Sequence, residues 1–126
     1  MYSDDRRYLD SHQWVKVEGE VGTVGITQHG QEELVEIVYV EFSPKGTKVK
    51  QKEPLCNLES IKTAFDVPSP VSGEIIEVNE KLGEDLSSIN NDPHGEGWLV
   101  KIKISDMSEV ESLLSASDYG KIIKKD

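Results

Sequence analysis

Apolar and polar residues alternate along most of the chain, which is the pattern of half-buried β-strands. The runs that follow this alternation are 14–17, 21–26, 36–42, 55–59, 65–67, 74–78 and 98–104. A further strand begins at Val49, and Gly19 occupies a turn between the first two runs. We therefore expect those two runs to form a hairpin within a mostly β protein.

Helical periodicity is limited to short segments. Residues 27–35 predict a helix with Thr27 as its N-cap. Near the C-terminus, Ser108 and Glu111 have the spacing of a capping box, and a second short helix is expected around Tyr119. These helices should lie at the periphery of the β structure.

The 126 residues suffice for one domain with a modest core, so we expect a single domain over 1–126. Within it, 1–10 reads as a polar, partly loose N-terminal segment and 106–126 as a C-terminal helical segment. Residues 89–97 are rich in turn formers and predict a polar loop.

An approximate internal echo links two of the predicted strands. Residues 36–40 (EIVYV) resemble 74–78 (EIIEV), and each copy is followed by a turn glycine, Gly46 or Gly83. The two copies flank Lys62. A pseudo-twofold pair of small sheets joined by the lysine turn would explain this arrangement, and chance similarity between two β segments is the alternative.

Charge and cysteine content exclude several classes of protein. Twenty-four acidic residues against 14 basic ones give a net charge of −10, which argues against a nucleic-acid partner because phosphates need a basic face. Cys56 is the single cysteine, so no internal disulfide and no cysteine-based zinc site is expected.

The first ten residues include five charged ones and no apolar run, and no stretch approaches the roughly 20 apolar residues of a membrane helix. We expect no membrane association and a cytoplasmic location.

The sequence offers no positive sign of an enzyme. No nucleophile elbow and no phosphate-cradling glycine loop is present, and Cys56 has no histidine near it in sequence. His12, His29 and His94 are far apart along the chain, so the sequence does not support a metal site.

Lys62 is the residue with the clearest functional context. It is one of 12 lysines, most of which must be solvated surface charges, but it lies in the turn between two predicted strands. Short side chains such as Ser60 leave room for an approaching enzyme, and the carboxylates of Glu59 and Asp66 mark the site electrostatically. These features predict a lysine that receives an amide-linked cofactor and presents it to partner enzymes on a flexible arm.

The chain resembles the glycine cleavage system H protein, a family of lipoyl carriers, from about Tyr8 to Lys124. The stretches that carry the resemblance are 11–15 (SHQWV), 24–27 (VGIT), 38–41 (VYVE), 59–62 (ESIK), 70–74 (PVSGE), 77–79 (EVN) and 91–98 (NDPHGEGW). Biotin carriers place methionines on both sides of the lysine, and the lipoyl domains of 2-oxoacid dehydrogenases are shorter. The resemblance implies a barrel–sandwich hybrid fold with lipoate attached to Lys62.

The resemblance also implies a role and partners. A lipoate ligase or lipoyltransferase would load the arm. Glycine decarboxylase, an aminomethyltransferase and a dihydrolipoyl dehydrogenase would then use it, with the chain acting as a non-catalytic carrier of the aminomethyl group. A freely swinging arm favours a monomer.

Three positions depart from the family pattern. Gln13 stands where the family usually has Glu, a carboxylate thought to hold the amine of the loaded arm, and Gln cannot supply that charge. Val35 replaces a glycine, and Phe65 replaces a small residue beside the lysine turn. With Glu33, these residues are expected to line the cleft in which the arm docks.

These departures leave two alternatives to glycine cleavage. Gln13 and Val35 favour a related lipoate-binding protein in another pathway, such as sulfur oxidation with heterodisulfide-reductase-like partners, which needs no amine pocket. The other alternative is an unmodified interaction module, and the intact lysine turn argues against it.

Overall fold

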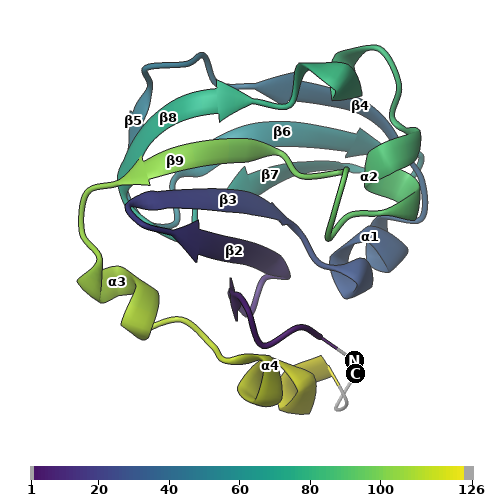
Figure 1. The fold of residues 1–126 in the computed structure, drawn as a ribbon. Coiled ribbons are helices and arrows are strands. Elements are labelled where there is room, and N and C mark those ends of the chain that lie inside the picture. The colour runs from purple at the N-terminus through teal and green to yellow at the C-terminus, as the bar shows by residue number, and fades with distance from the viewer. Residues whose placement is uncertain (1, 124–126) are drawn as a thin grey trace.

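Two β-sheets form the body of the protein in the computed structural model, which describes residues 2–123. One sheet has six strands in the order β1 (Arg7–Tyr8), β2 (Gln13–Glu18), β3 (Val21–Ile26), β9 (Val100–Ile104), β8 (Gly73–Val78) and β5 (Lys48–Val49). The other has three, in the order β4 (Ile37–Phe42), β6 (Pro54–Ser60) and β7 (Ala64–Pro68). All neighbouring strands are antiparallel, and Figure 1 shows the two sheets stacked as layers.

Short helices lie outside these layers. They are α1 (Gln28–Leu34), the 3₁₀ helix η1 (Glu80–Gly83), α2 (Ser87–Asn91), α3 (Ser108–Glu111) and α4 (Ala116–Ile123). Thr27 caps α1 as predicted, because its hydroxyl accepts a hydrogen bond from the backbone N–H of Gly30 at 3.1 Å. None of the helices within 2–123 is long and apolar enough to cross a membrane.

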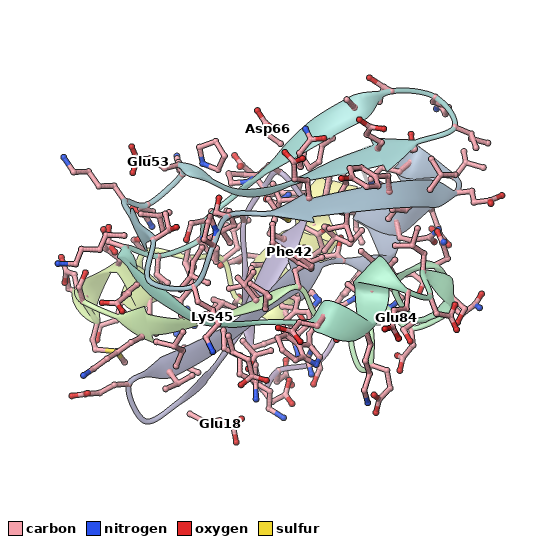
Figure 2. All side chains as sticks on the ribbon, turned by 90° about the horizontal axis from the view of Figure 1, so that it is seen from above. Glu18, Phe42, Lys45, Glu53, Asp66 and Glu84 are labelled. Atoms are coloured by element: carbon pink, nitrogen blue, oxygen red, sulfur yellow. The ribbon has the colours of Figure 1, made fainter. Side chains whose placement is uncertain are left out.

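The main core fills the space between the sheets. Both layers contribute fully buried residues, for example Val24 and Ile102 from the six-stranded sheet and Leu58 and Val67 from the three-stranded one. Phe42 points into the same space (Figure 2). Burial of each such side chain stabilises the fold by about 1.5–3 kcal/mol. The predicted β architecture with peripheral and C-terminal helices is confirmed.

A second, smaller core attaches the C-terminal helix. Tyr8, Trp14 and Tyr119 are buried together, and the rings of Tyr8 and Tyr119 stack with centroids 4.9 Å apart. Tyr8 in β1 also exchanges two backbone hydrogen bonds of 2.9 Å with Leu114. Tyr8 and Leu9, at the end of the segment expected to be partly loose, therefore belong to the packed part of the protein, because their side chains are withdrawn from solvent.

Two local predictions are wrong. Ser108 is the first residue of α3 rather than its cap, because its backbone N–H and its hydroxyl both donate to Asp106 Oδ1, and no capping box with Glu111 forms. Helix α2 occupies the start of the segment predicted as a polar loop.

Only part of the arrangement predicted from the echo is found, because each copy lies in its own sheet but the lysine turn does not join the two sheets. The two similar segments became β4 and β8, which lie in different sheets of unequal size. The Lys62 turn joins β6 and β7, both in the three-stranded sheet, so it does not connect the two layers.

Candidate functional site

Lys62 lies at the tip of the β6–β7 hairpin. The strands end at Ser60 and resume at Ala64, and the side chains of Ile61, Lys62 and Thr63 between them are exposed. The ladder continues to Glu59 opposite Ala64, so the tip projects directly from a paired β ribbon. A rigid ribbon with a short tip presents the amine at a fixed place while keeping it accessible to a large partner.

Ser60 holds the tip in shape. Its hydroxyl oxygen accepts hydrogen bonds from the backbone N–H groups of Lys62 and Thr63, both at 3.1 Å, and donates to the carbonyl of Thr63 at 3.1 Å. The Ser60 N–H donates to that same carbonyl at 2.8 Å. A serine hydroxyl commonly replaces backbone partners in such turns. The sequence predicted Ser60 as a recognition residue, and the structure adds a role in organising the turn.

The C-terminal end of α1 lies against the lysine tip. The Lys62 ammonium donates to the backbone carbonyl of Glu33 at 3.3 Å, and the N–H of Ile61 donates to the carbonyl of Glu36 at 3.1 Å. Carbonyls at a helix C-terminus carry partial negative charge and favour a nearby cation. The structure therefore brings Glu33, predicted as a cleft residue, into direct contact with Lys62.

The other residues predicted around the lysine face different ways. Asp66 is exposed and accepts a hydrogen bond from the Asn57 amide at 2.9 Å, and Figure 2 shows it on the outer side of the three-stranded sheet. Glu59 is also exposed. Phe65 lies opposite Leu58 and packs against the main core, so its ring contributes to the layer interior.

Val35 ends α1 with an unusual backbone conformation. Its φ of 70° and ψ of −72°, together with a 2.9 Å hydrogen bond from the Glu36 N–H to the Leu34 carbonyl, define a γ-turn of the rare positive-φ type. Only glycine adopts such a conformation without steric cost, and a β-branched residue is strained there. The backbone at Val35 therefore has a conformation that suits glycine. The Val35 side chain is 52% exposed beside the lysine tip.

Gln13 does not line a surface cleft. Its side chain is fully buried, its amide oxygen accepts a hydrogen bond from the Ser11 hydroxyl, and its amide nitrogen donates to the Ser11 carbonyl at 2.8 Å. The structure thus separates the four expected cleft residues. Glu33 and Val35 lie near Lys62, whereas Gln13 and Phe65 are turned into the protein.

Exposed apolar side chains gather at this end of the three-stranded sheet. Strand β4 pairs with β6 through Tyr39 opposite Glu59 and Ile37 opposite Ser60, with an irregularity at Val38. The large apolar residues exposed here are Val35, Val38, Tyr39 and Ile61. Such a group around an accessible lysine suits a surface that larger proteins contact.

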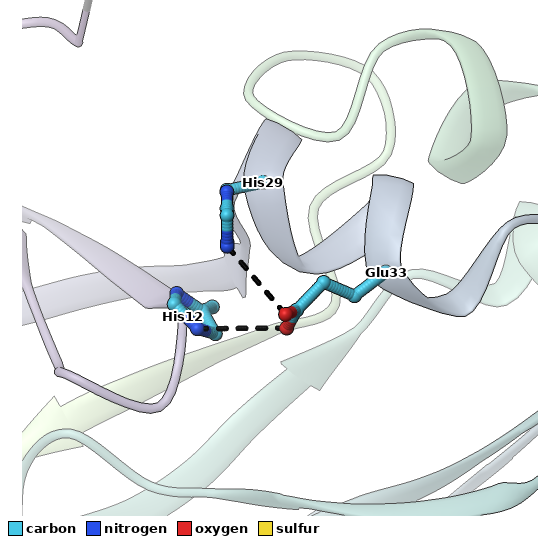
Figure 3. A group of neighbouring side chains, drawn as sticks. All are labelled: His12, His29 and Glu33. Carbon is cyan, nitrogen blue, oxygen red and sulfur yellow. Dashed lines mark ion pairs between the residues drawn. The ribbon is translucent and has the colours of Figure 1, made fainter. Parts of the chain in front are cut away.

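The fold also brings together residues that the sequence left apart. The imidazoles of His12 and His29 have centroids 4.5 Å apart, and both lie close to the Glu33 carboxylate (Figure 3). His94 lies elsewhere and stacks on Trp14. The sequence contained a sign that His29 and Glu33 would be neighbours, because residues four apart on a predicted helix share one face. It contained no such sign for His12.

A family profile and several curated relatives point to one family. The profile of the family described as Glycine cleavage H-protein matches residues 6–126. The chain is 49% identical to the glycine cleavage system H protein of Thermotoga maritima, over 90% of this chain and 92% of that protein. It is 46% identical to the mitochondrial glycine cleavage system H protein of Oryza sativa subsp. indica, over 94% of this chain and 72% of that one.

The fold agrees with these sequence similarities. A crystal structure of a glycine cleavage system H protein from Mycobacterium marinum superposes with a TM-score of 0.89 at 33% identity, covering 98% of this chain and 99% of that one. A family profile that matches nearly the whole chain and relatives of this similarity establish the same membership. The chain belongs to the glycine cleavage H-protein family.

Proposed function

We propose that this chain carries a lipoyl group on Lys62 and shuttles the aminomethyl group of glycine between the enzymes of the glycine cleavage system. The observation that carries the proposal is the exposed lysine at the tip of the β6–β7 hairpin in a member of this family. The enzymes that use the arm are the decarboxylase, the aminomethyltransferase and the dihydrolipoyl dehydrogenase.

The residues at the tip fit an amide-linked cofactor. The turn backbone is fixed by Ser60, and the Lys62 amine contacts a carbonyl rather than being locked into the core. Amide formation replaces the ammonium with a neutral N–H, so the attraction to the C-terminal end of α1 weakens and the arm gains freedom. When bound, the lipoyl group supplies the dithiol–disulfide chemistry that carries the one-carbon cargo and the electrons.

The charged and apolar groups around Lys62 would allow a modifying enzyme to recognise it. Glu59 and Asp66 provide negative charge on the hairpin, and the exposed apolar residues beside them provide contact area. A lipoate ligase or lipoyltransferase would read this surface, and the glycine cleavage partners would use the same end of the molecule. The monomeric state and the cytoplasmic location expected from the sequence stay predictions.

The resting arm is proposed to lie over the end of α1. Glu33 contacts Lys62, and Val35 lines an open groove whose other wall includes Leu86 and Asn90 of the α2 region. Gln13, by contrast, is buried with its amide bonded to Ser11, so its difference from Glu says little about cargo. This removes part of the motive for the sulfur-oxidation alternative, and the relatives named above carry glycine cleavage names.

The modification is tested by incubating the full chain with lipoate ligase, lipoate and ATP and mapping the product by peptide mass spectrometry. We expect modification of Lys62 alone, and none in Lys62→Arg. The matched control is Lys45→Arg, which changes another exposed turn lysine and should be modified normally. Modification that persists in Lys62→Arg, or none in the wild type, contradicts the proposal.

The pathway is tested with the lipoylated protein, glycine decarboxylase and labelled bicarbonate. Exchange of label into the glycine carboxyl group is expected only with modified Lys62. Normal lipoylation without exchange would separate the carrier role, which would stand, from the glycine cleavage role, which would not.

A further inference from the structure

His12, His29 and Glu33 form a cluster with the composition of a metal site. His12 lies in the turn between β1 and β2, and the other two lie one helical turn apart on α1. One potential ligand atom from each lies within 4.8 Å of the other two. Figure 3 shows both imidazoles directed at the same carboxylate.

The two nitrogen–oxygen distances in this cluster are those of ion pairs, and they are also close to the separation of two ligands on one metal ion. His12 Nε2 lies 3.5 Å from Glu33 Oε1, and His29 Nε2 lies 3.6 Å from Glu33 Oε2. A hydrogen bond between such atoms would measure about 2.7–3.2 Å. Two ligands bound tetrahedrally to Zn²⁺ at roughly 2.0–2.1 Å stand about 3.3 Å apart, which is close to the observed spacing. The three potential ligand atoms lie within 4.8 Å of one another, so they would have to draw closer around an ion.

Outer groups hold the His12 ring in the orientation that a ligand needs. His12 Nδ1 lies 2.7 Å from the Tyr119 hydroxyl, which is itself 2.7 Å from Thr27 Oγ1. If Nδ1–H donates to Tyr119, the lone pair of Nε2 points at the cluster. Histidines that bind metals are usually oriented by a hydrogen bond from the other ring nitrogen in this way.

The backbone also commits His12 to this place. Its φ is 78°, a conformation uncommon for residues other than glycine. Its carbonyl accepts a 3.0 Å hydrogen bond from Thr27 N–H, at the residue that caps α1. This hydrogen bond joins the turn that contains His12 to the start of α1, and it holds His12 beside His29.

Access and ligand type define which ion the cluster would take. The side chains of His12 and His29 are 16% and 21% exposed, and the Nε2 atom of His29 is itself buried. An ion would therefore reach the cluster past the Glu33 side chain, which is 56% exposed. Hard ions such as Mg²⁺ and Ca²⁺ prefer oxygen ligands, whereas imidazole nitrogens suit first-row transition ions. Three protein ligands leave a further coordination position for water or a solute.

From this geometry we infer that His12, His29 and Glu33 form a binding site for a divalent first-row transition ion such as Zn²⁺. The site uses this chain's own residues and does not require lipoylation, so it stands or falls separately from the carrier function. Because the Glu33 carbonyl also contacts Lys62, a bound ion would lie next to the start of the arm.

The test is isothermal titration of the full, unlipoylated chain with Zn²⁺, with Co²⁺ as a spectroscopic probe of coordination. We expect one Zn²⁺ per chain and the visible absorption of a tetrahedral or five-coordinate Co²⁺ centre. Glu33→Gln and His29→Gln should each weaken binding by about tenfold or more, since losing even an outer partner costs 10–100-fold in metal affinity. Tyr119→Phe should weaken it as well while keeping the ring that packs on Tyr8.

Matched controls separate the cluster from general surface binding. Glu32→Gln removes the same charge from the neighbouring helix position, and His94→Gln removes a histidine outside the cluster; both should bind Zn²⁺ as the wild type does. Far-UV circular dichroism checks that each variant is folded. No stoichiometric binding, or equal binding in Glu33→Gln and Glu32→Gln, overturns the inference.

Discussion

The tip of the β6–β7 hairpin and the aromatic cluster of Tyr8, Trp14 and Tyr119 differ in what holds their side chains. At the tip, Lys62 is exposed and its amine contacts a backbone carbonyl of α1. In the cluster, the rings are almost completely withdrawn from water. The two regions therefore have different roles. The lysine tip presents a group that partners must reach and contributes little to stability, whereas the aromatic cluster stabilises the scaffold.

The largest expected effect on stability is that of Trp14→Ala in the cluster. The Trp14 ring is 2% exposed, it lies under the Arg6 guanidinium, and its indole N–H donates to the Pro93 carbonyl at 3.0 Å. Truncation should cost about 3–5 kcal/mol of unfolding free energy, measured by urea denaturation. Lys62→Ala should change it by less than about 0.5 kcal/mol. Similar losses of unfolding free energy in Trp14→Ala and Lys62→Ala would contradict the proposal that the cluster stabilises the fold while the lysine tip does not.

A smaller effect is expected from pH at the edge of the same cluster. Burial, reinforced by the Arg6 charge, lowers the pKa of His94 to about 4, and the neutral ring accepts a 2.9 Å hydrogen bond from the Gln28 N–H at the start of α1. Since the unfolded chain takes up this proton near pH 6.5, the stabilisation is complete above pH 6.5 and is lost as the pH falls towards about 4.

This contribution should amount to roughly 1–2 kcal/mol, less than the full shift implies because the ring is only half buried. The measurement is the unfolding free energy of the wild type minus that of His94→Gln, followed from pH 7 to pH 4. A difference that stays constant over this range would show that His94 is not held neutral.

At the lysine tip, Ser60→Ala should have a more local effect. The substitution removes a hydroxyl that bonds three backbone groups of the turn, at a cost of about 1 kcal/mol in stability. We expect a slower initial rate of lipoylation by the ligase, because the turn no longer holds Lys62 in one place. Thr63→Ala, whose hydroxyl makes one long contact of 3.3 Å, is the control. Equal rates in both variants would contradict the role given to Ser60.

The smallest effect is a gain in stability from Val35→Gly. Relief of the positive-φ strain, about 1–3 kcal/mol, is partly offset by the extra freedom of glycine in the unfolded chain, leaving a net gain of about 1 kcal/mol. Val38→Gly, at another exposed valine nearby whose φ is not in the positive range, should instead lose stability. Thermal unfolding of the two variants gives the comparison, and a loss in Val35→Gly would rule out the strain.

The sequence predicted the β segments well because their information is local. The predicted run at 21–26 coincides with β3, the run at 74–78 differs from β8 by one residue, and the lysine turn fell between the correct strands. Alternation and turn-forming residues report on a strand and its ends, but not on which strand becomes its neighbour. This is why the echo between β4 and β8 suggested two sheets but misplaced the lysine turn, which joins two strands of one sheet.

The candidate site divides in the same way. Lys62, Ser60 and their turn follow from neighbouring residues, and the family follows from motifs spread along nearly the whole chain. The burial of Gln13 and the approach of His12 to His29 and Glu33 depend on how β1, β2 and α1 pack. Residues far apart in sequence meet only when the hydrophobic faces of their elements are buried together, so tertiary structure alone decided those contacts.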